Sequence, residues 1–374
     1  MKTPALAAAA LLLLGLPAAA QAPIRIGVAG PITGPYATTG AYLKNGAELA
    51  AEDINAAGGV NGQKIQILVA DDVADPRQAV SVANRFVSDA VPIVIGHATS
   101  GSTIPASDVY QESGVLQITP SSTSPRYTER GLWNTFRTCG RDDQQGEVAG
   151  RYLAKSYKGK RVAILHDKTP YGKGLADETQ KTMNAGGLKE VMYDGINPGE
   201  KDYSAVVSRL KSAGADIVYY GGLYTEAGLI VRQMRDQGLQ APMMGGDGLA
   251  TAEFAAIAGP GVEGSLITFA PDPRKNPSAR EVVERFRARG YEPESFTLYT
   301  YAAVQVVADA MRQTGGAEPK KLADAMRAGK PFKTVIGDLS FDKKGDITRP
   351  DFVVYAWKKG ADGKIDFAGN EVTE

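Results

Sequence analysis

The sequence has very few of the residues on which metal and redox sites depend. It contains one cysteine, Cys139, and two histidines, His97 and His166, among 374 residues. One cysteine cannot form an internal disulfide, and three such residues cannot supply a four-ligand Cys/His zinc cluster. We therefore expect neither a metal ion nor a cofactor, and we expect Cys139 to be a small buried apolar side chain.

The sequence also has no excess of charge of either sign. Lys and Arg together number 42, and Asp and Glu together also number 42, so the formal net charge is +0. Proteins that bind nucleic acid usually carry a cationic surface, so we expect no nucleic-acid partner. Hydrophobic residues make up 43% of the chain and charged residues 22%, which excludes wholesale disorder and a polytopic membrane protein. The length favours two globular domains.

Long apolar runs are missing apart from one at the N-terminus, where residues 1–22 are typical of an export signal. Lys2 supplies a positive start, Ala5–Leu16 is apolar, and Ala20-Gln21-Ala22 offers a small-residue cleavage site. Cleavage after Ala20 is an alternative to cleavage after Ala22. The apolar run is too short to cross a bilayer, which takes about 20 residues. Because no cysteine lies near the cleavage site, we expect a soluble periplasmic protein without a lipid anchor.

After Pro23, short β-branched runs alternate with segments of helical periodicity. The first predicted elements are a strand at 25–29, a helix at 42–56, a strand at 64–69, a helix at 76–88 and a strand at 92–95. A second series has a helix at 142–157 and strands at 161–165, 215–220 and 266–269. This alternation predicts an α/β protein with two mostly parallel sheets flanked by helices.

The last part of the sequence is less regular and too short for a third domain. Its predicted elements are helices at 278–289, 297–314 and 320–327 and strands at 336–341 and 352–357. We expect these strands to complete the two sheets, with crossings between the domains near 139–141, 269–271 and 347–350. The predicted domains are 23–140 with 271–348, and 141–270 with 349–374. Three connecting segments favour hinge closure.

Motifs for nucleotide binding and hydrolysis are missing from the expected places. The turn after the first strand reads Gly30-Pro31-Ile32-Thr33-Gly34-Pro35, and its prolines remove amide donors that a phosphate cradle needs. Ser100-Gly101-Ser102 resembles a nucleophile loop, but a nucleophile needs a positioned base, and the nearby His97 ends a predicted buried strand. We therefore do not expect an enzyme.

Small hydroxyl residues follow two strands of the first predicted sheet, at Thr99–Thr103 and at 119–123. Ligands of open α/β sheets collect at the carboxyl ends of strands. Hydroxyls and helix N-terminal amides suit a carboxylate, although the same residues could only cap helices and form turns. The second domain offers Tyr171, Tyr224 and Asp247. Hydroxyls facing aromatic rings and one carboxylate would complement a zwitterion.

Many short segments match one family in register. They include Gly46-Ala47-Glu48, Asp53-Ile54-Asn55-Ala56-Ala57-Gly58-Gly59-Val60-Asn61-Gly62, Val94-Ile95-Gly96-His97, Ile118-Thr119-Pro120, His166-Asp167-Lys168 and Val218-Tyr219-Tyr220-Gly221-Gly222. With them the chain resembles the periplasmic substrate-binding proteins of ABC transporters for leucine, isoleucine and valine. The resemblance implies a type I two-lobed α/β fold with a three-strand hinge. It also implies closure around an amino acid and delivery to permease subunits in the inner membrane, and we expect a monomer.

The resemblance implies a set of ligand-binding residues. The ligand's carboxylate would be bound by Ser100 and Thr123, with the Ser121 backbone beside them, and its amine by Asp247. The other expected contacts are the loop tyrosine Tyr171, the aromatic wall Phe296, and Ala98, Tyr36 and Tyr224.

The sequence departs from the leucine-binding pattern around the ligand's side chain. Thr39 and Leu223 stand where close relatives of that type carry tyrosines, and Asp247 stands where they carry glutamate. Their small-loop disulfide is replaced by Ala74 and Thr99. A leucine, isoleucine or valine ligand is favoured, because the neighbouring tyrosines 36, 42 and 224 can fill the same space. The alternatives are another zwitterion or an aromatic acid as ligand, or a sensory ligand-binding protein of the same fold.

Overall fold

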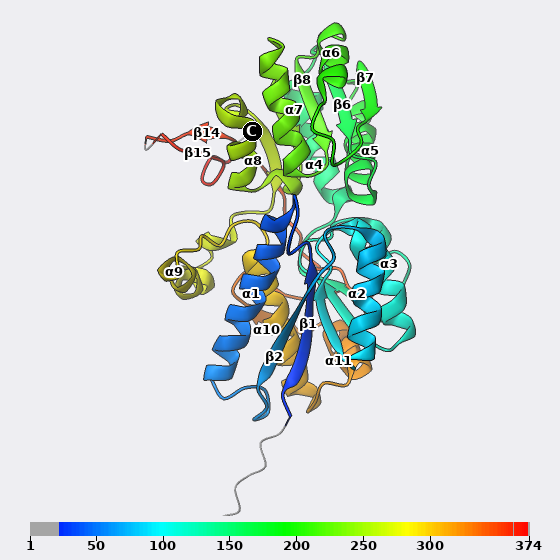
Figure 1. The fold of residues 1–374 in the computed structure, drawn as a ribbon, viewed down its shortest axis with the longest axis vertical. Helices are drawn as coiled ribbons and strands as arrows, with labels where there is room; N and C mark the ends of the chain where they lie inside the picture. Colours follow the sequence, from blue (N-terminus) through cyan, green and yellow to red (C-terminus); the bar gives the residue numbers. More distant parts are fainter. Residues whose placement is uncertain (1–21, 362, 373–374) are drawn as a thin grey trace, which may run out of the picture.

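The computed structural model describes residues 22–361 and 363–372. The predicted export signal lies outside the described residues except for Ala22. Within the described ranges, no helix combines the length and apolarity needed to cross a membrane. The described chain forms two α/β lobes that are stacked along the long axis of the molecule (Figure 1).

The first lobe is built on a five-stranded parallel sheet with the strand order β2-β1-β3-β4-β5. The strands are β1 (Ile24–Gly30), β2 (Ile65–Asp71), β3 (Ile93–Gly96), β4 (Leu116–Thr119) and β5 (Thr135–Arg137). One face packs on α1 (Ala37–Ala56), α9 (Arg280–Ala288), α10 (Thr297–Thr314) and α11 (Pro319–Arg327). The other face packs on α2 (Pro76–Ser88) and α3 (Ser100–Glu112). Helices on both faces explain why β3 and β4 are buried throughout.

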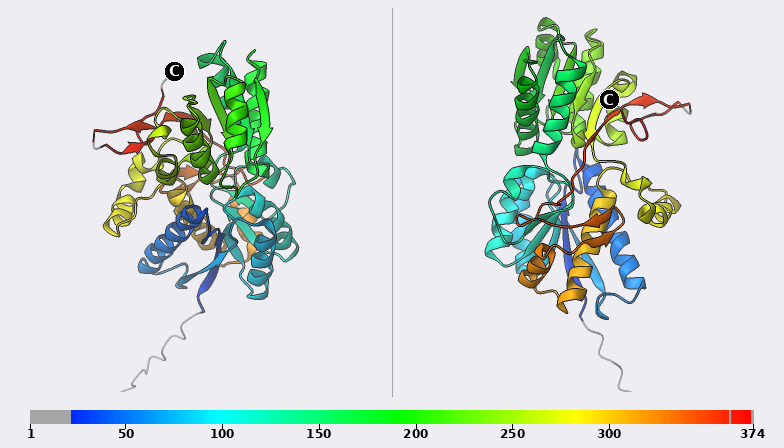
Figure 2. Two further views of the ribbon diagram at one scale, coloured as in Figure 1. Left: turned by 45° about the horizontal axis from the view of Figure 1, so that its top comes forward. Right: turned by 180° about the vertical axis from the view of Figure 1, so that it is seen from behind.

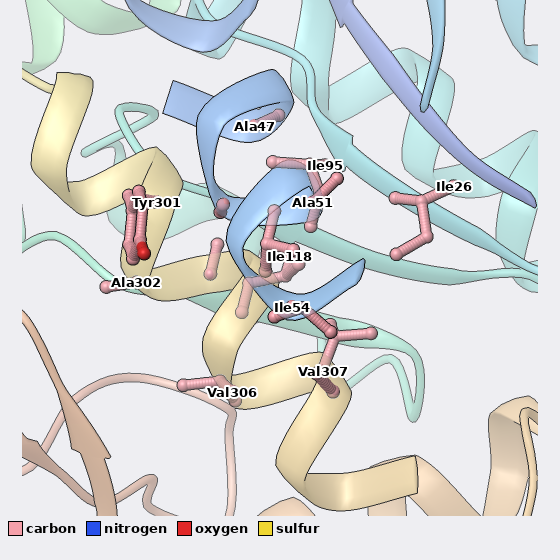
Figure 3. Close-up of a cluster of buried hydrophobic side chains, with 14 of the residues drawn as sticks. Ile26, Ala47, Ala51, Ile54, Ile95, Ile118, Tyr301, Ala302, Val306 and Val307 are labelled. Atoms are coloured by element: carbon pink, nitrogen blue, oxygen red, sulfur yellow. The ribbon is translucent and has the colours of Figure 1, made fainter. Parts of the chain in front are cut away.

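The core of this lobe joins residues that are distant in the sequence. Figure 3 shows Ile54 of α1 beside Val307 of α10, and Ala51 of α1 beside Ile95 of the sheet. A side chain at position 46 would clash with the backbone of α10, so glycine permits the close approach of the two helices. Burial of each large aliphatic side chain stabilises the lobe by about 1.5–3 kcal/mol.

The second lobe is built on a six-stranded sheet with the order β13-β10-β9-β8-β6-β7. The strands are β6 (Val162–His166), β7 (Met192–Gly195), β8 (Ile217–Gly221), β9 (Met243–Gly245), β10 (Leu266–Phe269) and β13 (Val353–Ala356). Only the edge strand β13 is antiparallel to its neighbour. One face packs on α4 (Asp142–Ser156) and α5 (Pro170–Ala185). The other packs on α6 (Ser204–Ser212), α7 (Tyr224–Asp236) and α8 (Ala252–Ala258).

The prediction that the C-terminal strands complete the two sheets is right for one strand and wrong for the other. β13 joins the second sheet, but the segment predicted as a strand at 336–341 pairs locally, as β11 (Phe332–Thr334) with β12 (Gly337–Leu339). The edge of β5 is bonded instead by a turn, because Gly345 O accepts from Arg137 N at 3.0 Å. A further hairpin joins β14 (Lys358–Lys359) to β15 (Ile365–Asp366) beside the second lobe (Figure 2).

Candidate functional site

A cavity of about 380 Å³ lies between the two lobes. Its walls come from the loops that follow β1 to β4 in the first sheet and β6 to β9 in the second. This position, at the carboxyl ends of parallel strands, is where open α/β sheets bind ligands. The volume suits a small molecule. Eight of the nine residues predicted from the sequence line the cavity, namely Tyr36, Ala98, Ser100, Ser121, Tyr171, Tyr224, Asp247 and Phe296.

The first-lobe wall is centred on the N-terminus of α3. Thr99 caps this helix in an extended conformation, and its hydroxyl accepts from Ser102 N at 3.4 Å. Ser100 opens the helix and is 1% exposed, and its hydroxyl accepts from Ser124 N at 3.2 Å. The free amides of a helix's first turn and the positive end of its dipole both favour an anion. This wall therefore suits a carboxylate.

The two hydroxyl loops of this wall are bonded to each other. The Ser121 hydroxyl donates to Ala98 O at 2.9 Å, and the Ser122 hydroxyl donates to the same oxygen at 3.1 Å. The Thr119 hydroxyl donates to His97 O at 2.8 Å. The hydroxyl of Ser121 is thus engaged within the wall.

Thr123 is the predicted site residue that does not line the main cavity. It lines a much smaller adjoining cavity, together with Asp247 and Phe296, which line both. Its hydroxyl is buried and interacts with the Asp142 carboxyl. Its role as a ligand contact stays a prediction.

The second-lobe wall holds a buried carboxyl, Asp247, in the short turn after β9. The Tyr171 hydroxyl donates to Asp247 Oδ1 at 3.0 Å and accepts from Gly248 N at 2.9 Å. Burial raises the pKa of Asp247 to about 6, although the hydrogen bond from Tyr171 acts in the opposite direction. Near neutral pH this carboxyl is mainly ionised. A buried carboxylate that is shielded from solvent is stabilised by a cationic partner such as an ammonium group.

Two tyrosines of the cavity lining, Tyr36 and Tyr224, connect the two lobes. The Tyr36 hydroxyl of the first lobe donates to Glu226 Oε1 of the second at 2.8 Å. The Tyr224 hydroxyl donates in return to Pro35 O at 3.2 Å. The Tyr36 and Tyr224 rings meet edge to face, with centroids 6.1 Å apart. Sequence reasoning missed Glu226, because only the folded structure shows that this acidic residue of α7 is 1% exposed.

The rest of the lining is largely apolar. Phe296, at the start of α10, packs edge to face on Phe269 and Tyr299, with centroids 5.4 and 5.6 Å away. Thr39 and Leu223, the two positions that depart from the leucine-binding pattern, both line the cavity. These positions can therefore affect the fit of a ligand's side chain directly.

The structure gives His97 no role as a catalytic base. Its Nδ1 lies 2.6 Å from Asp72 Oδ2 and its Nε2 lies 3.1 Å from the Tyr110 hydroxyl, and all three residues are fully buried. Both ring nitrogens are therefore occupied, and neither can activate Ser100 or Ser102. His97 instead fixes the loop after β2 against α3.

A second buried carboxyl, Asp142, lies near Asp247 and was not among the predicted site residues. It opens α4, where an acidic residue ordinarily complements the helix dipole. In the structure it is fully buried, and this burial raises the pKa of its carboxyl well above the usual range. The sequence signal, an acidic residue in a first helical turn, is too common to indicate such burial.

Comparison with known proteins settles the family. The sequence profile of the periplasmic binding proteins matches residues 23–363. The chain belongs to this family. The Leu/Ile/Val-binding protein homolog 1 of Brucella suis is 57% identical to this binding protein over 348 residues, which cover 93% of this chain and 94% of the relative. The family resemblance inferred from the sequence is thus confirmed.

Solved structures of the family share the fold of this binding protein. A leucine-binding protein from Thermotoga maritima is 27% identical, with a TM-score of 0.84 over 92% of this chain and 98% of its own. A branched-chain amino acid transporter substrate-binding protein from Streptococcus pneumoniae, solved with isoleucine, is 28% identical, with a TM-score of 0.84 over 94% of this chain and 100% of its own. The predicted type I periplasmic binding protein fold is confirmed.

Proposed function

We propose that this protein is a periplasmic receptor that captures a branched-chain amino acid between its lobes and delivers it to an ABC permease. The observation that carries the proposal is the pairing of two walls across one cavity. The N-terminus of α3, with Ser100, suits a carboxylate, and the buried carboxyl of Asp247 suits an ammonium. A free amino acid carries both groups. The similarity to a Leu/Ile/Val-binding protein homolog and to a substrate-binding protein solved with isoleucine supports a branched-chain ligand.

In the proposed complex, the ligand carboxylate accepts from the Ser100 hydroxyl and from amides of the first turn of α3. Asp247, held by Tyr171, accepts from the ligand ammonium. The aliphatic side chain packs against the apolar lining, including Phe296 and Leu223. The receptor carries out no reaction, acts as a monomer and binds no nucleic acid.

We propose the two lobes as the two domains, 23–140 with 271–348 and 141–270 with 349–374. The chain passes between the lobes after β5, after β10 and before β13. Closure about these three connections would bring the Ser100 wall and the Asp247 wall onto the same ligand. The contacts between Tyr36 and Glu226 then hold the closed form.

Calorimetric titration tests the proposal. Protein stripped of ligand by unfolding and refolding is titrated with leucine, isoleucine and valine, with nucleotides and sugars as controls. We expect saturable binding of at least one branched-chain amino acid and no heat from the controls. Absence of binding by all three amino acids would overturn the proposal.

A second ligand class, a bulkier or aromatic amino acid, is favoured by one observation. Thr39 and Leu223 lie in the cavity wall where relatives of the leucine-binding type carry tyrosines. If neighbouring tyrosines fill that space, one methylene more or less in the ligand changes binding by about 1–3 kcal/mol. If the space stays open, phenylalanine displaces labelled leucine at equal concentration. Competition between the two amino acids decides between these ligand classes.

A further inference from the structure

Arg137 of β5 is a fully buried cation that lines neither of the two cavities described above. Its guanidinium donates to Asp346 Oδ1 at 2.6 Å, to Ser122 O at 2.6 Å and to Ser124 O at 3.0 Å. The guanidinium carbon also lies over the ring of Tyr127, 5.3 Å from its centroid. The planar guanidinium thus holds two backbone carbonyls of one loop and one carboxylate at the same time.

The loop that Arg137 holds, residues 121–124, belongs to the first-lobe wall of the ligand cavity, where Ser121 lines the main cavity. Ser124 connects Arg137 with the end of α3 that suits a carboxylate. Its carbonyl oxygen accepts from Arg137, and its N–H donates to the Ser100 hydroxyl at 3.2 Å. The hydrogen bond that orients Ser100 therefore depends on an arginine outside the cavity.

The same guanidinium is tied to two of the three connections between the lobes. One carboxylate oxygen of Asp346 accepts from Arg137, and the other accepts from Arg141 Nη1 at 2.7 Å. Arg141 stands at the connection after β5, and Asp346 stands ahead of the connection before β13. These connections touch, because a Cβ at Gly140 would lie 2.5 Å from the ring of Phe352. The loop is thus anchored near the point about which the lobes would turn, where a rotation displaces it least.

The stability of the fold does not by itself call for an arginine in this place. Removing a guanidinium from water offsets much of what its ion pair contributes, so apolar side chains of similar volume often stabilise a fold as well. An apolar side chain cannot donate, however. Without Arg137, the buried carbonyls of Ser122 and Ser124 would lose two charge-assisted hydrogen bonds, and the loop could shift.

We propose that Arg137 is a positioning residue for the ligand's carboxylate. It fixes loop 121–124 against Ser100 and, through Asp346, fixes the same loop to the hinge. The carboxylate side of the cleft then keeps its shape with and without ligand. The inference rests on the proposed function and adds to it a residue that acts without touching the ligand. Loss of Arg137 should weaken every ligand that carries a carboxylate and spare a ligand that carries only an amine.

Calorimetric titration of Arg137→Met with three probes tests this inference. Leucine carries both charged groups, 4-methylpentanoate carries only the carboxylate, and 3-methylbutan-1-amine carries only the ammonium. Affinity for the first two should fall by about tenfold or more, which corresponds to the loss of one well-placed hydrogen bond to a charged group. Affinity for the amine should change by no more than about twofold, because this probe has no carboxylate to misplace.

Arg137→Lys is the gentler variant, because it keeps a positive charge beside Asp346 but loses the planar group that reaches both carbonyls. It should show the same contrast between the probes with a smaller loss. Arg327→Met is the matched control. Arg327 donates to Trp133 O and Lys343 O at 2.5 and 3.0 Å in the same lobe, and none of these three residues lines the ligand cavity. This variant should bind all three probes as the parent does, even if its melting temperature is lower.

Hydrogen exchange in the stripped parent tests the inference without any variant. If Arg137 holds the loop, the amides of Ser122 and Ser124 should exchange far more slowly than in an unstructured peptide before any ligand is added. Fast exchange that becomes slow only with leucine would show that the ligand orders the loop, and would overturn the inference.

Two results of the titrations would also overturn it. One is an equal loss of affinity for the amine and for the two carboxylates, which would mean general damage to the fold. The other is unchanged binding of leucine by a folded Arg137 variant. No binding of leucine by the parent would instead overturn the proposed function, and this inference with it.

Discussion

The two walls of the cavity differ in how far the hydrogen bonds and charges of their polar groups are paired within the protein before a ligand binds. In the first-lobe wall, Ser121 donates to Ala98 O and Ser100 accepts from Ser124 N, so both hydroxyls at the N-terminus of α3 are bonded and uncharged. In the second-lobe wall, Asp247 is a buried anion whose pKa is raised to about 6. Bonded, neutral hydroxyls can stay unchanged when the cleft opens. A buried anion gains most from a cation, so the second wall should dominate the dependence of binding on charge.

The largest effect is expected from Asp247→Asn, which keeps the shape but removes the charge of the second wall. Leucine affinity should fall by about 30- to 1,000-fold, or roughly 2–4 kcal/mol, because a buried ammonium loses its counter-ion. Binding of 4-methylpentanoate, which has no amine, should change little. Calorimetric titration of both ligands measures the contrast, with the exposed Asp177→Asn as the control.

The same substitution should raise the stability of the ligand-free protein, although it lowers the affinity for leucine. The pKa of Asp247 is raised in the folded state, so its contribution to stability is fully present below the unfolded pKa near 4 and is lost as the pH rises through about 6. Asp247→Asn should therefore stabilise the empty protein at pH 7.5 by up to about 3 kcal/mol. A lowered melting temperature, with equal loss of affinity for both ligands, would show that Asp247 only supports its turn.

Ser100→Ala tests the first wall and should have a smaller effect. It removes one donor to the ligand carboxylate, a hydrogen bond to a charged group, which is worth about 1.5–3 kcal/mol or roughly 10- to 150-fold in affinity. Leucine and 4-methylpentanoate should lose affinity equally, because both carry the carboxylate. The exposed Ser81→Ala on α2 is the control. If the double variant Ser100→Ala with Thr123→Ala binds leucine as well as the parent does, these two residues do not bind the ligand's carboxylate.

Acid should weaken binding through the second wall alone. Below pH 6 Asp247 takes up a proton, so leucine affinity should fall by up to about tenfold per pH unit. Binding of 4-methylpentanoate should not follow this profile between pH 5 and 7. Titrations at three pH values compare the slopes, and parallel slopes for the two ligands would contradict the difference between the walls.

The smallest effect is expected from Tyr36→Phe, which cuts a contact between the lobes and leaves both walls intact. Loss of the hydrogen bond to Glu226 should weaken binding by about two- to twelvefold, or roughly 0.5–1.5 kcal/mol. The change should appear as faster leucine dissociation in stopped-flow displacement, because the contact holds the closed form. Tyr193→Phe, whose hydroxyl bonds Asp177 within the second lobe, is the control. An unchanged dissociation rate would rule out a role for Tyr36 in closure.

Local signals in the sequence predict two helices of the first lobe together with their bounds. The predicted bounds of α2 and α10 match the structure, because Asp75 and Pro76 start the first and Gly315, with φ of 77°, ends the second. Helix α1 begins earlier than predicted, at Ala37 rather than Tyr42. Its first turn packs so closely on Pro31 that only glycine fits at position 40.

The sequence predicts much less of the second wall, because burial decides what an acidic residue does there. Asp142, Asp167 and Glu226 look like ordinary helix or loop acids in the sequence, yet each is at most 3% exposed. Asp247 was singled out among the loop residues of the second domain, and its assignment to the ligand's amine came from the family resemblance. Thr123 lies outside the main cavity because of the way the loop after β4 packs, and the sequence does not show this packing either.

Titration of the stripped protein with leucine and with its two half-ligands tests the central claim most directly. One half-ligand, 3-methylbutan-1-amine, lacks the carboxylate, and the other, 4-methylpentanoate, lacks the amine. If one zwitterion spans both walls, each half-ligand should bind at least about 30-fold more weakly than leucine, since each loses a charged contact worth about 2 kcal/mol or more. Either half-ligand binding as tightly as leucine would contradict the claim that both walls bind the same ligand.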